Sequence, residues 1–122
     1  MNSARSEFDE DAPVAGAIYS VTSGDGGFGI AKVLVADDTG VHVCLYRNRF
    51  PSRPVSVNLG DLSVGSIFDS DGFGIGHLPL SYAEFSSWQP QYLVATDVAE
   101  EELEGYRYWK EDQGGVFGKE PN

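Results

Sequence analysis

The chain has 122 residues, of which 41% are hydrophobic, and 19 acidic against 8 basic side chains give a formal net charge of −11. This length and composition predict one globular domain with its own core and exclude a disordered chain. The charge disfavours nucleic acid and anionic membrane as partners and favours a basic protein, although acidity that serves only solubility is an alternative. Because no window approaches ~18 apolar residues and no secretory signal is present, we expect a cytoplasmic protein.

The N-terminal residues 1–13 are expected to form a disordered acidic tail, because they hold four carboxylates and one large apolar residue, Phe8. Residues 14–122 are then a single α+β domain. Its first predicted elements are strands over 18–21 and 28–35, which a Gly-rich turn at 23–27 joins into a hairpin. After a turn at 36–40, a third strand over 41–46 places alternate side chains on opposite faces, with His42 and Cys44 on the same one.

This first hairpin also carries a resemblance. Gly16-Ala17-Ile18-Tyr19, the Gly-rich turn and the run Lys32-Val33-Leu34-Val35 resemble immunity protein family 26 of bacterial polymorphic toxin systems. The resemblance covers mainly residues 16–46. It implies a small cytoplasmic inhibitor that binds a toxin domain, and it transfers no binding residue to this chain.

Residues 47–54 are expected to be a loop, since two prolines remove strand hydrogen-bond donors, and a short strand is predicted over 55–57. Three of the eight basic residues fall here, and Arg47, Arg49, Phe50 and Arg53 form the candidate partner- or anion-binding site. Arginine can hold a carboxylate or phosphate through two hydrogen bonds, and it often anchors interfaces. The alternative is that these arginines pair with the chain's own carboxylates or stay hydrated.

A second copy of the hairpin pattern occupies residues 65–77, with Asp71-Gly72-Phe73-Gly74-Ile75 matching Asp25 to Ile30. We therefore predict an α+β fold on a small curved antiparallel sheet or partly open barrel, built from two similar β-hairpins, with one short and one longer C-terminal helix. The acidic run Asp69-Ser70-Asp71-Gly72 resembles the start of a calcium loop, but apolar residues follow where further ligands are needed, which favours an ordinary turn.

The C-terminal part is predicted to be mainly helical. Ser81 and Glu84 have capping-box spacing, which predicts a short helix through Trp88, followed by a strand over 92–95. Thr96 or Asp97 is predicted to cap a final helix, in which Gly105 weakens the helix by up to ~1 kcal/mol relative to Ala and allows close packing. A terminal strand is predicted over 116–118. The expected core consists of Ile18, Tyr19, Ile30, Val33, Val43, Leu45, Ile67, Phe68, Phe85, Leu103 and Trp109.

The remaining candidates for chemistry are His42, His77 and Cys44. The single cysteine is interpreted as a buried, inert thiol, with a nucleophile activated by His42 as the alternative. The two histidines could meet in space as acid and base, but packed and hydrogen-bonded histidines are the favoured interpretation. No spacing typical of a metal site accompanies them, so no metal or cofactor is expected.

Together these features favour a non-catalytic cytoplasmic protein-binding domain, such as an immunity-type inhibitor of a basic toxin domain. One alternative is a small-anion-binding module or enzyme that uses the loop from Arg47 to Arg53 near His42 or His77. Another is a structural subunit of a homo-oligomer that associates through exposed aromatic residues such as Trp88 or Trp109.

Overall fold

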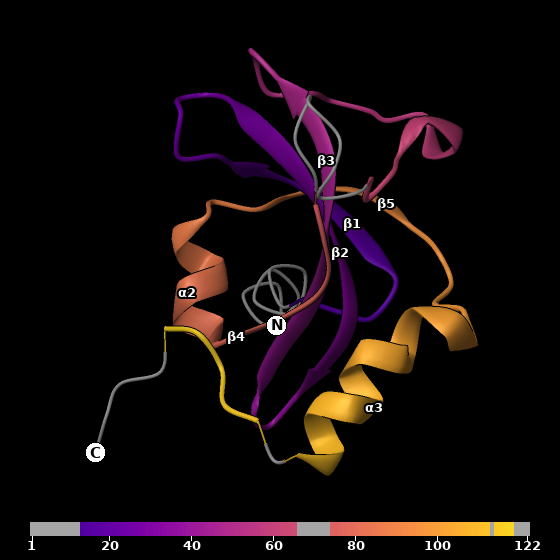
Figure 1. Ribbon diagram of the computed structural model, residues 1–122. Helices are drawn as coiled ribbons and strands as arrows, with labels where there is room; N and C mark the ends of the chain where they lie inside the picture. Colours follow the sequence, from indigo (N-terminus) through magenta and orange to yellow (C-terminus); the bar gives the residue numbers. More distant parts are fainter. Residues whose placement is uncertain (1–12, 66–73, 113, 119–122) are drawn as a thin grey trace, which may run out of the picture.

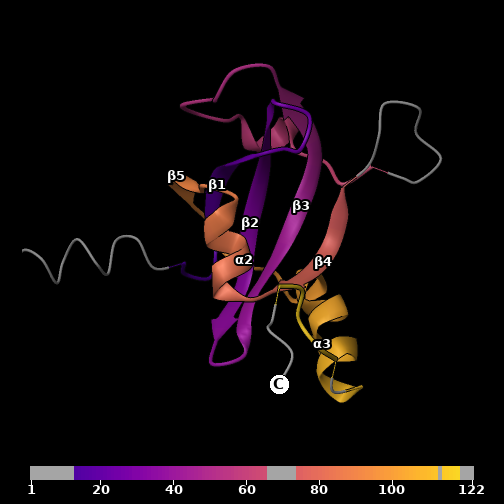
Figure 2. The same cartoon turned by 90° about the vertical axis from the view of Figure 1, so that its left-hand side faces the viewer.

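The computed structural model describes residues 13–65, 74–112 and 114–118. Its strands are β1 (Ala17–Thr22), β2 (Phe28–Asp37), β3 (Gly40–Phe50), β4 (Ile75–Leu80) and β5 (Gln91–Ala95), and they form one antiparallel sheet in the order β4-β3-β2-β1-β5 (Figure 1). Figure 2 shows the sheet from β5 at one edge to β4 at the other. The α+β prediction is confirmed, and the sheet is open.

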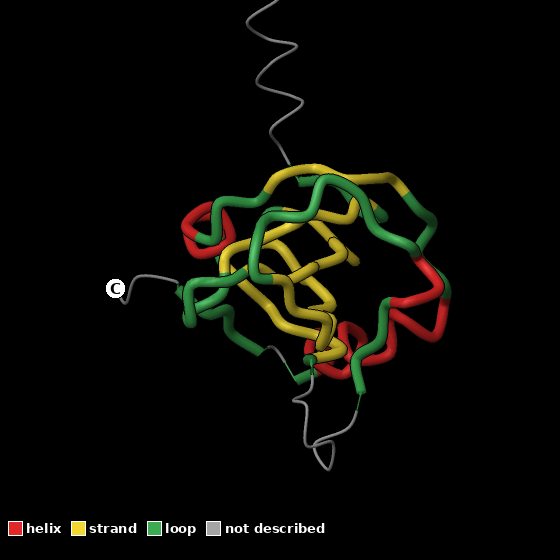
Figure 3. Tube along the Cα trace, turned by 90° about the horizontal axis from the view of Figure 1, so that it is seen from above, coloured by secondary structure: helices red, strands yellow, loops and turns green. Residues whose placement is uncertain are grey.

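Helices cover both faces of this sheet. The short α2 (Tyr82–Ser87) lies on one face, and η2 (Glu100–Leu103) continues into α3 (Glu104–Glu111) on the other (Figures 1 and 3). A further 3-10 turn, η1 (Leu59–Asp61), lies between β3 and β4 in the chain. None of the helices in the described ranges is long and apolar enough to span a membrane.

The two helix starts differ in how well local sequence predicted them. The hydroxyl of Ser81 accepts a hydrogen bond from the Glu84 amide at 3.0 Å, which confirms the predicted cap of α2. The predicted cap of the C-terminal helix at Thr96 or Asp97 is wrong, because η2 begins after Ala99. There the amide of Ala99 donates to the Glu102 carboxylate at 2.8 Å, which satisfies a donor at the helix start.

The main core lies between the sheet and α2. Tyr19 and Phe85 meet edge to face there, with ring centroids 5.6 Å apart. Six predicted core residues are buried, namely Ile18, Tyr19, Ile30, Val33, Val43 and Phe85. Leu45, Leu103 and Trp109 are half-buried, while Ile67 and Phe68 lie outside the described residues. The opposite face of the sheet also buries Lys32 and His42, so β2 and β3 are covered on both sides.

The residue that follows β5 is hydrogen-bonded to the residue that precedes β1. The amide and hydroxyl of Thr96 both donate to the Gly16 carbonyl at 2.8 Å. Gly16 has φ +91°, and a Cβ built on it would lie 2.0 Å from the Thr96 carbonyl oxygen, so only glycine fits. This contact fixes the segment after β5, from which the C-terminal helix starts.

Three predicted segments turned out differently. β3 continues to Phe50, so the loop begins later than residue 47, and residues 55–57 are irregular rather than a strand. The terminal strand is reduced to one parallel bridge between Phe117 and Leu80. The turn of the predicted second hairpin falls on residues 66–73, outside the described residues; the segment that follows it, β4, pairs with β3.

Candidate functional site

The segment from Asp97 to Asp112, here called the arm, carries most of the exposed carboxylates among the described residues. It carries seven of the 19 acidic residues and only two basic ones, Arg107 and Lys110. Six of its carboxylates are exposed, those of Asp97, Glu100, Glu101, Glu104, Glu111 and Asp112. Arg107 forms an exposed ion pair with Glu100, which contributes little to stability. The outward surface of the arm is therefore strongly negative.

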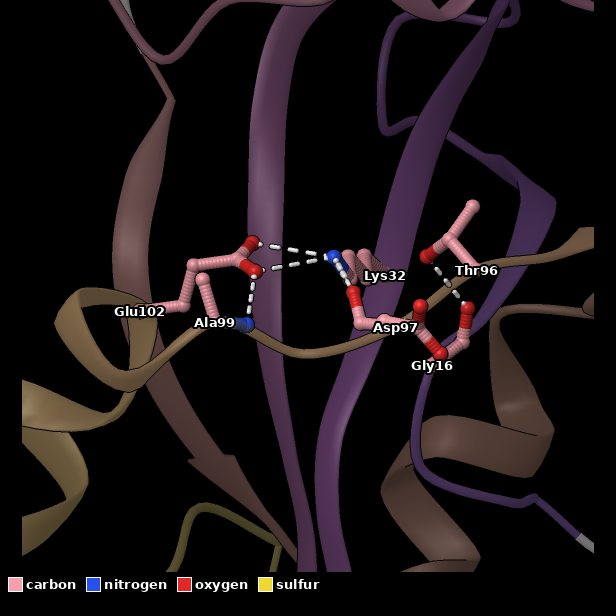
Figure 4. Close-up of polar contacts among 6 residues, drawn as sticks. All are labelled: Gly16, Lys32, Thr96, Asp97, Ala99 and Glu102. Atoms are coloured by element: carbon pink, nitrogen blue, oxygen red, sulfur yellow. Dashed lines mark hydrogen bonds and ion pairs between the residues drawn. The ribbon is translucent and has the colours of Figure 1, made fainter.

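One buried cation attaches the arm to the sheet. Lys32 on β2 is 6% exposed, and its ammonium group donates to both carboxylate oxygens of Glu102 at 3.0 and 3.1 Å and to the Asp97 carbonyl at 2.6 Å (Figure 4). The same Glu102 carboxylate also accepts a hydrogen bond from the Ala99 amide. All three ammonium protons thus have acceptors, which is what a buried lysine requires.

Two histidines form the second attachment. His42 on β3 is fully buried, and its Nδ1 lies 3.0 Å from Nε2 of His77 on β4, with the rings stacked. Tyr106 and Trp109 of α3 meet the His42 ring edge to face, with centroids 4.8 and 4.4 Å away. This confirms that the histidines are packed and hydrogen-bonded. A hydrogen bond between two imidazoles needs one nitrogen without a proton, so at least one ring is neutral.

The environment of this pair disfavours positive charge. Burial lowers the pKa of His42, an effect that the Asp37 carboxylate partly opposes. Burial and the neighbouring His42 lower the pKa of His77 to about 4. Both rings are therefore neutral at pH 7, and the arm packs on an uncharged aromatic cluster.

Cys44 follows His42 on the same face of β3. It is buried, as predicted, and burial raises the pKa of its thiol to about 11. Burial also raises the pKa of Tyr46, the next side chain along this face. A protonated thiol is a poor nucleophile. His42, the residue that could have activated the Cys44 thiol, contacts His77 instead. This environment fits the inert-thiol interpretation.

The arginines of the predicted binding loop do not form one cluster. Arg53 donates to the carbonyl and hydroxyl of Ser20 and lies 4.8 Å from the Phe28 ring centroid, on the face that the arm covers. Arg49 donates instead to the Tyr46 and Asn48 carbonyls, and it lies beside Gly29 on the α2 face. The backbone amide of Arg47 donates to the Ser63 carbonyl, and Phe50 ends β3 opposite Phe28.

Sequence reasoning missed the role of Lys32 and Glu102. The signal for Lys32 was present, because a lone cation inside the apolar run from Ile30 to Val35 must either be exposed or find a partner. Nothing local indicated that the partner lies 70 positions later. In the described part of the chain, no group of three or more His, Cys, Asp and Glu side chains is placed to hold a metal ion.

Comparisons of this chain with protein-family models, with curated proteins and with solved structures each find no match.

Proposed function

We propose that this chain is a non-catalytic binding protein whose arm recognises a basic protein, acting as an immunity-type inhibitor of a basic toxin domain. The observation that carries the proposal is the arrangement of charge on α3. Glu104, Tyr108 and Glu111 are all exposed and fall on one side of the helix by their spacing of three and four, with Glu101 one turn earlier.

The inward side of the same helix supports this role. Gly105, Tyr106 and Trp109 face the sheet, so the carboxylates on the other side are presented by a helix that is held in place. Negative charge on a fixed surface speeds encounter with a basic partner. Tyr108, 63% exposed, adds an aromatic side chain of the kind that anchors protein interfaces.

The experiment begins with capture from a lysate of the source cells, using the full chain as bait at moderate salt. Captured protein counts as support only if it is basic, arrests growth when expressed alone, and no longer does so when this chain is co-expressed. Its affinity for the purified chain is then measured by titration calorimetry.

Two double variants with the same change in net charge locate the interface. Glu104→Gln with Glu111→Gln neutralises the arm, while Asp38→Asn with Asp61→Asn neutralises exposed carboxylates elsewhere. We expect the arm variant to raise Kd about 3- to 10-fold and the control to change it less than about twofold. Equal effects would mean that overall charge rather than the arm is recognised. A captured partner that is acidic or harmless would contradict the proposed function itself.

A further inference from the structure

A second surface feature lies on the α2 face, away from the arm. A cleft of about 410 Å³ opens beside the turn after β1 and the end of α2. Its apolar walls are Val21, Leu45 and Trp88. Two glycines, Gly24 and Gly29, complete the lining, and the polar side chains are those of Thr22, Ser23 and Arg49. A mostly apolar hollow with few polar groups is typical of a small-molecule site.

The cleft is built from fixed parts. The indole N–H of Trp88 donates to the Glu84 carboxylate at 3.0 Å, and the Trp88 carbonyl accepts from both the amide and the hydroxyl of Thr22. The Trp88 ring also packs against Phe85, with centroids 6.1 Å apart. These contacts fix one wall of the cleft before any ligand binds, and a preformed wall lowers the ordering cost of binding.

Arg49 supplies the charge at the rim. Its Nη1 donates to the carbonyls of Tyr46 at 2.8 Å and Asn48 at 3.1 Å, so its position is fixed by neutral acceptors. Its Nη2 and Nε have no hydrogen-bond partner among the described residues, and that edge of a guanidinium matches the two oxygens of a carboxylate. Asp25 lies near enough for the Arg49 charge to act on it, but its carboxylate accepts hydrogen bonds from Ser23 and Gly27.

We infer that this cleft binds a small molecule with one carboxylate and an apolar body, the carboxylate on Arg49 and the body against Val21, Leu45 and Trp88. A single negative charge is specified because Asp25 and the chain's net charge of −11 oppose a dianion. The inference is independent of the arm and of the proposed function.

The test uses three probes of one shape, 3-phenylpropionate, 3-phenylpropanamide and 3-phenylpropylamine, which differ in charge. Each is titrated into the ¹⁵N-labelled chain, and the indole N–H resonances are followed by NMR. Trp88 lines the cleft, whereas the indole N–H of Trp109, in the arm, donates a hydrogen bond to the Gly115 carbonyl and acts as an internal reference. We expect saturable shifts at Trp88 only, with the carboxylate binding at least ~10-fold more tightly than the amide.

Three variants separate the effect of charge from the effect of shape. Arg49→Gln should reduce carboxylate affinity to the level of the amide, and Arg49→Lys should retain part of it. Gly29→Ala should weaken both probes equally, because its Cβ would lie 3.9 Å from Val21 Cγ2 and 3.7 Å from Arg49 Nη1, an ordinary contact that fills the cleft. Equal affinity for acid and amide, equal shifts at both indoles, or no saturation by the acid would each overturn the inference. An unchanged thermal melt shows that each variant is folded.

Discussion

Gly105 is the residue that lets α3 approach the sheet. A Cβ at this position would lie 2.6 Å from His77 Cβ and 3.2 Å from His77 Cγ, closer than side chains pack. The close approach expected from the sequence is therefore present. It explains why a helix tolerates a residue that costs about 1 kcal/mol in propensity.

The first prediction follows from this contact. Gly105→Ala should lower the free energy of unfolding by about 1–3 kcal/mol, because overpacking against His77 outweighs the gain in helix propensity. Urea denaturation monitored by circular dichroism measures it. Gly76→Ala is the matched control, since a Cβ at Gly76 meets nothing within 4 Å. A Gly105→Ala variant as stable as the native chain would contradict the packing argument.

The two members of the Lys32–Glu102 ion pair should contribute unequally to stability. The Lys32 side chain is 8% exposed and that of Glu102 is 29% exposed. Removing the Glu102 carboxylate therefore leaves the more deeply buried charge, that of Lys32, without a partner. We expect Glu102→Gln to cost about 2–4 kcal/mol and Lys32→Met distinctly less, because uncompensated buried charge is the larger penalty. Chemical denaturation of both variants and of the double variant Lys32→Met, Glu102→Gln tests this order. The reverse order would show that lost packing of the lysine stem dominates.

The histidine pair makes attachment of the arm depend on pH. The pKa of His42 is lowered from 6.5, and that of His77 falls to about 4. Below pH 6.5 the unfolded chain therefore binds protons that the folded chain does not. The free energy of unfolding should decrease as pH falls from 6.5 towards 4 and be independent of this pair above pH 7.

The measurement is urea denaturation at pH 7.0, 6.0 and 5.0, where most carboxylates are still ionised. We expect a loss on the order of 1–2 kcal/mol over this interval. In His77→Gln this loss of stability should be clearly smaller, because only His42 still titrates and no second imidazolium can form beside it. Parallel pH profiles for the two proteins would rule out the histidine pair as the cause.

Local patterns explain which elements were predictable. The alternation and turn of β1 and β2, and the Ser81 cap of α2, are set by neighbours in sequence, and these predictions were right. The arm was predicted as a helix, but its attachment was not, because Lys32 and Glu102 are brought together only by tertiary structure. The separation of Arg49 from Arg53 has the same origin. Arg49, one residue before the end of β3, lies on the α2 face, whereas Arg53 in the following loop lies on the other face, where it donates to Ser20 of β1.

For the whole molecule, a net charge of −11 predicts opposite effects of salt on stability and on binding. Screening reduces repulsion among the carboxylates of the folded chain, so raising NaCl from 20 to 300 mM should raise Tm by about 3–6 °C. The same screening should weaken capture of a basic partner. Thermal melts and calorimetry over one salt series measure both. A Tm that falls with salt would show that attractive ion pairs outweigh the repulsion.

The pairing of β5 with β1 also determines when the sheet can be completed. Thr96 meets Gly16 across 80 positions of the chain, so during translation β1 has no partner on that side until residue 95 has left the ribosome. Closing so long a loop makes this pairing a slow step of folding. Until then, β1 presents an unpaired edge that carries Ile18, Tyr19 and Val21. Chaperones bind segments of this kind, and such edges also pair with other chains during aggregation.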